Sequence, residues 1–161
     1  MLYRKFTSQI ENHLLTQPNK ILLVNGARQI GKSYIIRYVG KRMFTNYVEI
    51  NLKEDKEGLG VFSTVRSTAD FHLQLGAIAG DKLGTKSDTL VFLDEIQSYP
   101  HLMTMLKFLN QEARYTYIAS GSQLGVALSQ TASVPIGSIS VVEMFPLDFE
   151  EFLLAMGCAQ A

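Results

Sequence analysis

Cysteine is almost absent from this 161-residue sequence, and neither sign of charge is in excess. The single cysteine, Cys158, excludes an internal disulfide framework and is typical of a protein kept in a reducing compartment. Lysine and arginine together number 15, as do aspartate and glutamate, so the chain has no strong general attraction for nucleic acid or anionic lipid. Neither class of partner is indicated, although a local basic patch is compatible with this balance.

Long hydrophobic runs are also missing, since no apolar stretch is long enough to span a bilayer. Charges and amides interrupt the first 15 residues, MLYRKFTSQIENHLL, so they lack the apolar region of a secretory leader. These absences predict a cytoplasmic protein without a membrane partner. What is present is a 47% apolar composition, over a length that suits one domain with a sizeable core.

Strand-like and helix-like segments alternate along the chain. Apolar runs bounded by turn residues predict strands at 19–26, 47–52, 89–95, 114–122 and 138–145. Apolar residues at helical spacing predict helices at 1–15, 31–44, 69–80, 100–113 and 146–157, of which the third lies inside a loop-rich stretch from 53 to 88. This alternation predicts an α/β fold with a parallel sheet covered on both faces, and a ligand beyond the carboxyl ends of its strands.

The segment GARQIGKS, residues 26–33, fits the pattern G-x-x-x-x-G-K-[ST] and lies between a predicted strand and a predicted helix. Its glycines allow the main chain to approach a ligand, and successive N–H groups with the positive end of the helix would hold phosphate. Lys32 is predicted to contact the β- and γ-phosphates, and Ser33 to ligate Mg²⁺. The alternative is a glycine-rich turn that only joins strand to helix. The predicted nucleotide-binding residues of this stretch are Gly26, Ala27, Arg28, Gln29, Ile30, Gly31, Lys32, Ser33 and Tyr34.

Two adjacent acids, Asp94 and Glu95, end the apolar run TLVFLDE at 89–95. They would repel each other there without a cation, and a nucleotide-bound Mg²⁺ supplies one. Asp94 is therefore the predicted metal partner opposite Ser33, while Glu95 is predicted to polarise the attacking water. Glu95 and Lys32 are the predicted catalytic residues. The alternative is a pair of solvated carboxylates that cap the next segment.

The acidic pair also separates classes of phosphate-loop proteins. Regulatory GTPases carry D-x-x-G at this point, whereas this chain reads DEIQ, and its TKSD segment at 85–88 precedes the acidic strand instead of following it. Adenine is therefore favoured, which makes ATP and Mg²⁺ the predicted ligands. Small-molecule phosphate-loop kinases stay open as an alternative, but they usually carry an arginine-rich lid late in the chain, and no arginine follows Arg114.

Two further roles have several candidates. A polar residue at the end of the fourth predicted strand, in IASGSQ, is expected near the γ-phosphate or the water; the candidates are Ser120, Ser122 and Gln123, and Ser122 is preferred over a plain Ser/Gly turn. Hydrolysis also tends to require a cationic finger. That charge comes either from a neighbouring subunit or from one of the candidates Arg28, Arg66 and Arg114.

Together the segments GARQIGKS, VFLDEIQSYPHLMTMLK, IASGSQ and EMFPLDFEEFL resemble the prokaryotic AAA-type ATPases whose C-terminal half is a domain of unknown function. The last segment carries P-L-x-F-x-E-F, the most family-specific piece. The resemblance implies a P-loop NTPase three-layer α/β/α sandwich with a mainly parallel five-stranded sheet, in an order like 5-1-4-3-2. It also implies the roles already given to Lys32, Ser33, Asp94, Glu95 and Ser122.

The same resemblance implies an ATPase core at 1–154 and places 155–161 at the start of a truncated C-terminal extension. Two departures stand out, since Gly137-Ser138 replaces a usual Gly-Arg and Ala27 replaces a usual proline. The expected function is binding and hydrolysis of Mg·ATP that drives conformational change in a missing C-terminal domain, with a homo-oligomer or a partner protein as a source of the arginine finger. The alternatives are an ATP-dependent switch with little turnover and a small P-loop phosphotransferase.

Overall fold

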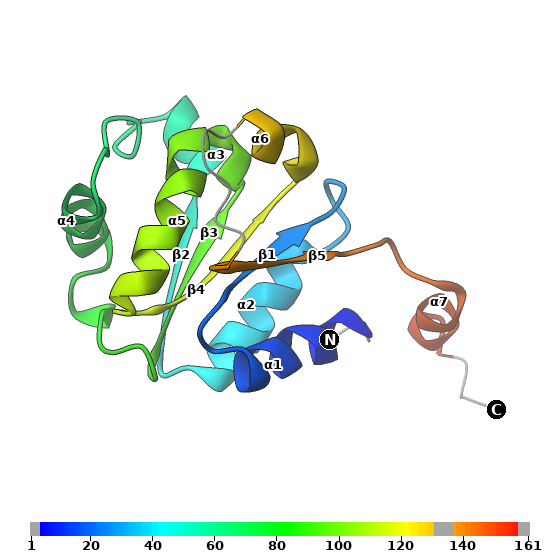
Figure 1. Ribbon diagram of the computed structural model, residues 1–161. Coiled ribbons are helices and arrows are strands. Elements are labelled where there is room, and N and C mark those ends of the chain that lie inside the picture. Colours follow the sequence, from blue (N-terminus) through cyan, green and yellow to red (C-terminus); the bar gives the residue numbers. More distant parts are fainter. Residues whose placement is uncertain (1–3, 131–136, 158–161) are drawn as a thin grey trace.

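A single five-stranded sheet forms the middle layer of the protein (Figure 1). The computed structural model describes residues 4–130 and 137–157. All four pairings between neighbouring strands are parallel, in the order β2-β3-β4-β1-β5. Read from the other edge, this is the predicted order 5-1-4-3-2, which confirms the P-loop NTPase type of α/β fold. The strands are β1 (Ile21–Asn25), β2 (Asn46–Asn51), β3 (Thr89–Asp94), β4 (Thr116–Gly121) and β5 (Ile139–Glu143).

Helices cover both faces of the sheet. On one side lie α1 (Phe6–Thr16) and α2 (Lys32–Met43), and on the other α4 (Thr68–Ala79) and α5 (Pro100–Glu112) (Figure 1). The remaining elements are α3 (Leu52–Glu57), α6 (Leu124–Gln130), α7 (Phe149–Ala155) and the 3-10 helices η1 (Gly80–Lys82) and η2 (Ile96–Ser98). The helix predicted at 69–80 is α4. The prediction missed α3 and α6, because helices this short show no apolar period.

The central strands are buried on both faces, which explains their continuous apolar runs. Along β1, Ile21 and Leu23 belong to the core beneath α4 and α5, whereas Leu22 and Val24 belong to the core beneath α1 and α2. All six residues of β3 are buried. The carboxyl ends of β1, β3 and β4 therefore form a rigid edge on which a site can be built.

A buried ion pair joins the start of the described chain to α7. Arg4 Nε donates to Glu151 Oε2 at 3.0 Å, and both side chains are at most 7% exposed. Arg4 also donates to the Ile30 carbonyl at 2.7 Å and to the Phe145 carbonyl at 2.6 Å. The P-L-x-F-x-E-F element thus contributes its second glutamate to a contact that ties α7 to the loop after β1. Residues 1–3 of the predicted first helix, and Cys158 with the rest of 158–161, lie outside the described residues.

Changing Glu151 to glutamine should lower the free energy of unfolding by about 2–3 kcal/mol, since the buried Arg4 guanidinium loses its counter-charge. Urea denaturation followed by circular dichroism measures this loss. Lys5→Gln is the matched control, because Lys5 pairs with Asp148 and Glu150 on the exposed surface. A loss in Glu151→Gln no larger than in the control would contradict the anchoring role of the pair.

Within the described residues, no helix is both long enough and apolar enough to cross a membrane.

Candidate nucleotide-binding site

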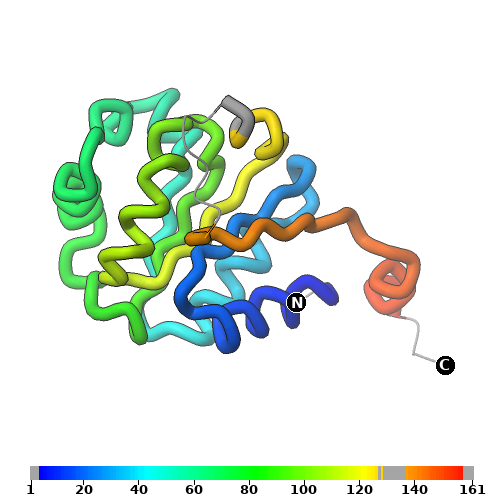
Figure 2. The backbone as a smooth tube through the Cα atoms, viewed as in Figure 1, coloured from blue at the N-terminus to red at the C-terminus, as the bar shows by residue number. Residues whose placement is uncertain are grey.

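The loop between β1 and α2 lies against the segment that follows β5 (Figure 2). At Gly26, a Cβ atom would stand 2.7 Å from the Met144 carbonyl oxygen, so a larger residue has no room. Gly31 has φ of 96°, in the left-handed region that favours glycine. Between them, Gln29 also has a positive φ, of 62°. Both glycines of the motif are therefore required by the path of the backbone.

Lys32 folds back over this loop and is 6% exposed. Its Nζ donates to the carbonyls of Gly26 at 2.7 Å and Ala27 at 2.6 Å. Burial lowers the pKa of Lys32, although the carboxylates of Glu95 and Asp94 act in the opposite direction. The ammonium group lies in a position where the oxygens of a polyphosphate would stabilise its charge.

The amino end of α2 begins at Lys32 with no side-chain cap. The helices α1 and α5 also begin without a side-chain cap, whereas α3, α4 and α7 are each capped by a side chain, from Asn51, Ser67 and Asp148 respectively. An uncapped helix start presents backbone N–H groups, together with the positive end of the helix dipole. A phosphate group is a suitable partner for such an end.

Asp94 is held at the end of β3 by three donors. Ser33 Oγ donates to Oδ2 at 2.6 Å, Ser120 Oγ donates to Oδ1 at 2.7 Å, and the Glu95 N–H donates to Oδ1 at 2.9 Å. Within residues 4–130 and 137–157, no three or more histidine, cysteine or acidic side chains form a group that could hold a metal ion by themselves. Mg²⁺ bound together with a nucleotide needs only one or two carboxylates, so a hydroxyl beside a carboxylate fits it.

Glu95 has a left-handed backbone, with φ of 58° and ψ of 47°. Such angles are uncommon outside glycine and concentrate at functional sites. The Glu95 carboxylate accepts a hydrogen bond from the Gln97 amide at 2.6 Å, and the same amide nitrogen reaches Ser122 Oγ at 3.5 Å. The structure thus brings the preferred serine, Ser122, close to the predicted base through Gln97. Gln97 is not among the predicted site residues, although it is the last residue of the DEIQ segment at 94–97.

Two cavities meet at the loop. The first, of about 560 Å³, has a polar lining of Arg28, Gln29, Gly31, Lys32, Ser33, Tyr34, Asn51, Lys53, Glu54, Glu57 and Glu95. The second, of about 550 Å³, has a more apolar lining of Arg4, Gln29, Ile30, Gly31, Tyr34, Ile35, Pro146 and Leu147. Because Gln29, Gly31 and Tyr34 line both, the cavities adjoin at the start of α2. Together they offer a polar and an apolar compartment beside the loop.

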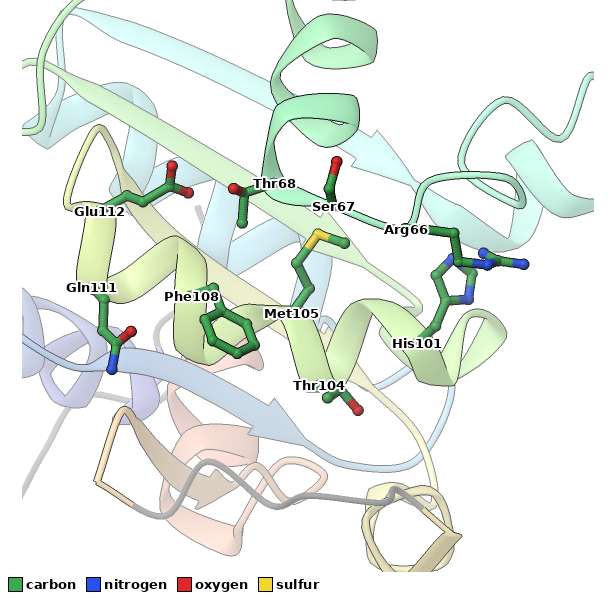
Figure 3. A pocket seen from close by; sticks show the side chains of 9 residues that line it. All are labelled: Arg66, Ser67, Thr68, His101, Thr104, Met105, Phe108, Gln111 and Glu112. Atoms are coloured by element: carbon green, nitrogen blue, oxygen red, sulfur yellow. The ribbon is translucent and has the colours of Figure 1, made fainter.

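The three candidate arginines lie apart. Arg28 lines the polar cavity. Arg66 lines a different cavity, of about 540 Å³, between α5 and the start of α4, as Figure 3 shows. Arg114 packs over the ring of Tyr115, 5.7 Å from its centroid. Gln123, the remaining candidate at the end of β4, is exposed. Of these residues, Arg28 alone lines the cavity beside Lys32.

Comparisons with known proteins identify the family and the fold of this chain. A family model described as an AAA domain matches residues 18–153. The uncharacterized protein MJ1544 of Methanocaldococcus jannaschii is 27% identical over 137 residues, which are 84% of this chain and 29% of that protein. This chain therefore spans less than a third of the length of that relative.

Two solved structures share the fold at 12% identity. A cryo-EM reconstruction of Hsp104 in its closed state, with ATPyS and FITC casein, has a TM-score of 0.64 over 95% of this chain and 28% of its own. The Pif1 helicase of Candida albicans has a TM-score of 0.57 over 94% of this chain and 42% of its own. At this identity the likeness concerns the fold alone.

Proposed function

This chain belongs to the AAA domain family, and we propose that it binds ATP together with Mg²⁺ and hydrolyses ATP to ADP and phosphate. The observation that carries the proposal is the contact of Ser33 Oγ with Asp94 Oδ2 at 2.6 Å. It joins the phosphate-loop motif to the acidic strand end, beside a buried lysine and an uncapped helix start. The AAA-type fold supports nucleotide binding, and the carboxylate next to Asp94 supports hydrolysis.

The two adjoining cavities suggest how the nucleotide lies. The polar cavity contains Lys32, Ser33 and Glu95, so the triphosphate belongs there. The more apolar cavity, beside Ile30 and Leu147, suits the base and ribose. Tyr34 borders both cavities and is 52% exposed, and in this arrangement it would lie beside the α-phosphate and the ribose.

Ser33 and Asp94 are the residues that would hold the metal, which neutralises charge on the phosphate oxygens when it is bound. Glu95 would accept a proton from water as the water oxygen bonds to the γ-phosphorus. The bond from that phosphorus to the β,γ-bridging oxygen breaks, giving ADP and phosphate. Lys32 would stabilise the negative charge on the phosphate oxygens.

Two features support a role for the cycle beyond this chain. Arg4 links the loop carbonyl of Ile30 to Glu151 on α7, so a change in the loop on nucleotide binding would reach α7. MJ1544 extends well beyond the matched part. We therefore infer that nucleotide turnover moves a further domain, and that Arg28 or an arginine from a neighbouring copy supplies the finger.

Addition of Mg·ATP should raise the melting temperature, because a ligand that binds only the folded state stabilises it by mass action. At about 100 times the dissociation constant, the expected gain of about 2.7 kcal/mol corresponds to a shift of roughly 5–10 °C. Differential scanning fluorimetry measures it, with Mg²⁺ alone and Mg²⁺ with AMP as controls. No shift at millimolar Mg·ATP, or an equal shift with AMP, would contradict the proposal.

A further inference from the structure

Gln97 holds a position between the two halves of the site that the proposed chemistry leaves unused. It lies in η2, directly after the acidic pair, and is half-buried. Its amide nitrogen donates to Glu95 Oε2 at 2.6 Å and to Ser122 Oγ at 3.5 Å. Its amide oxygen is buried and has no hydrogen-bond partner in the described part of the chain. An unpartnered buried carbonyl is costly, so this orientation needs a compensating contact.

The Glu95 carboxylate supplies that compensation and fixes the direction of the amide. In the opposite orientation, the amide oxygen of Gln97 would face a carboxylate that only accepts hydrogen bonds. The end of β4 is shaped to the same side chain, because a Cβ atom at Gly121 would overlap Gln97 Oε1. The glycine therefore leaves the space into which the amide oxygen points.

Two serines at the end of β4, Ser120 and Ser122, each support a different member of the acidic pair. Ser120 donates to Asp94 directly, at 2.7 Å, and so supports the metal side of the site. Ser122 contacts Gln97, and Gln97 contacts Glu95, so this second route supports the predicted base. The left-handed backbone of Glu95 fixes where its side chain begins. It does not fix where the carboxylate points, so a side-chain contact is needed to orient that group.

We propose that Gln97 is the positioning residue for hydrolysis, holding the Glu95 carboxylate in register with Ser122. This inference rests on the proposed ATPase function. With Oε2 engaged by the amide, Oε1 is the oxygen that receives the proton from water, and its direction is set by the hydrogen bond at 2.6 Å. Gln97 itself touches neither water nor phosphate in this scheme. Its loss therefore lowers the rate of the chemical step and leaves nucleotide binding in place.

The test is steady-state phosphate release by Gln97→Met, which keeps the length of the side chain and removes the donor. The expected kcat is about 10–100-fold below that of the wild type, with KM and the affinity for Mg·ATP changed by less than about threefold. Gln97→His keeps an N–H donor and should recover part of the rate. Gln111→Met is the matched control, since Gln111 is exposed on α5 outside both cavities at the loop.

A pH profile separates positioning from a general structural role. Gln97→Glu places a second carboxylate beside Glu95, which disfavours ionisation of the pair and should move the acidic limb of kcat to higher pH. Lys32, Arg28 and Asp94 also act on this part of the site and are unchanged in the variant. A melting temperature is recorded for every variant.

Wild-type kcat and an unshifted pH profile in Gln97→Met and Gln97→Glu would overturn the positioning role. If Gln97→Met is unfolded, the folded variants Gln97→His and Gln97→Glu decide the question by the same two readouts. A wild-type protein that neither binds nor hydrolyses ATP would instead overturn the proposed function, and this inference with it.

Discussion

Replacement of Glu95 by glutamine should lower kcat for ATP hydrolysis by about 10²–10⁴-fold, the usual contribution of a general base. The amide keeps the size of the side chain but cannot accept the proton of the attacking water. Affinity for Mg·ATP should change little, because Lys32, Ser33 and the start of α2 are untouched. Phosphate release under saturating ATP, together with equilibrium binding of a fluorescent ATP analogue, measures both quantities on the same preparations.

Glu57→Gln is the matched control for this substitution, since Glu57 lines the same cavity but is exposed on α3. Its turnover should equal that of the wild type. Turnover unaffected by Glu95→Gln would count against Glu95 as the base and would favour a binding switch. Phosphate transferred to an added acceptor, instead of released into solution, would favour a phosphotransferase.

Lys32→Ala should weaken binding of Mg·ATP by about 2–5 kcal/mol, or roughly 30- to 5,000-fold, as expected when one partner of a buried charge pair is removed. The protein without ligand should unfold at nearly the wild-type temperature. The substitution frees the carbonyls of Gly26 and Ala27, but it also removes an ammonium group whose pKa burial has lowered. Binding titrations and thermal unfolding separate these two effects.

Lys53 offers a control for charge alone, because it lines the same cavity without folding over the loop. Lys53→Ala should retain most of the affinity. An equal loss in both variants would mean that the cavity attracts anions by general electrostatics and that Lys32 has no special position. Retained affinity in Lys32→Ala would contradict its contact with the phosphates.

The loop and the acidic strand end could be predicted because their chemistry depends on residues close together in the sequence. Gly26, Gly31, Lys32 and Ser33 lie within eight consecutive positions, and a backbone that turns from a strand into a helix places them together. The run before Asp94 is apolar because β3 is buried on both faces. The order of the strands came from the resemblance of four segments to a family, and the structure confirms it.

Contacts between distant segments could not be predicted in the same way. Ser120 reaches Asp94, and Ser122 reaches Gln97, because β4 pairs with β3, and neither local segment names the residue that it contacts. Arg4 and Glu151 are 147 positions apart. No sequence pattern marks them as partners, since each stands among other charged residues. The contacts that orient the predicted site residues are therefore known only from the three-dimensional structure.

In the proposed site, the loop at 26–33 binds a triphosphate together with a divalent ion held by Ser33 and Asp94. A calorimetric titration of the wild-type protein with ATP, with and without Mg²⁺, tests this directly. One ATP should bind per chain, with an affinity that falls when Mg²⁺ is chelated, because Ser33 and Asp94 hold the nucleotide through the metal. Heat that does not saturate at millimolar ATP, or an affinity indifferent to Mg²⁺, would contradict the contact between the loop and the acidic strand end as a Mg·ATP site.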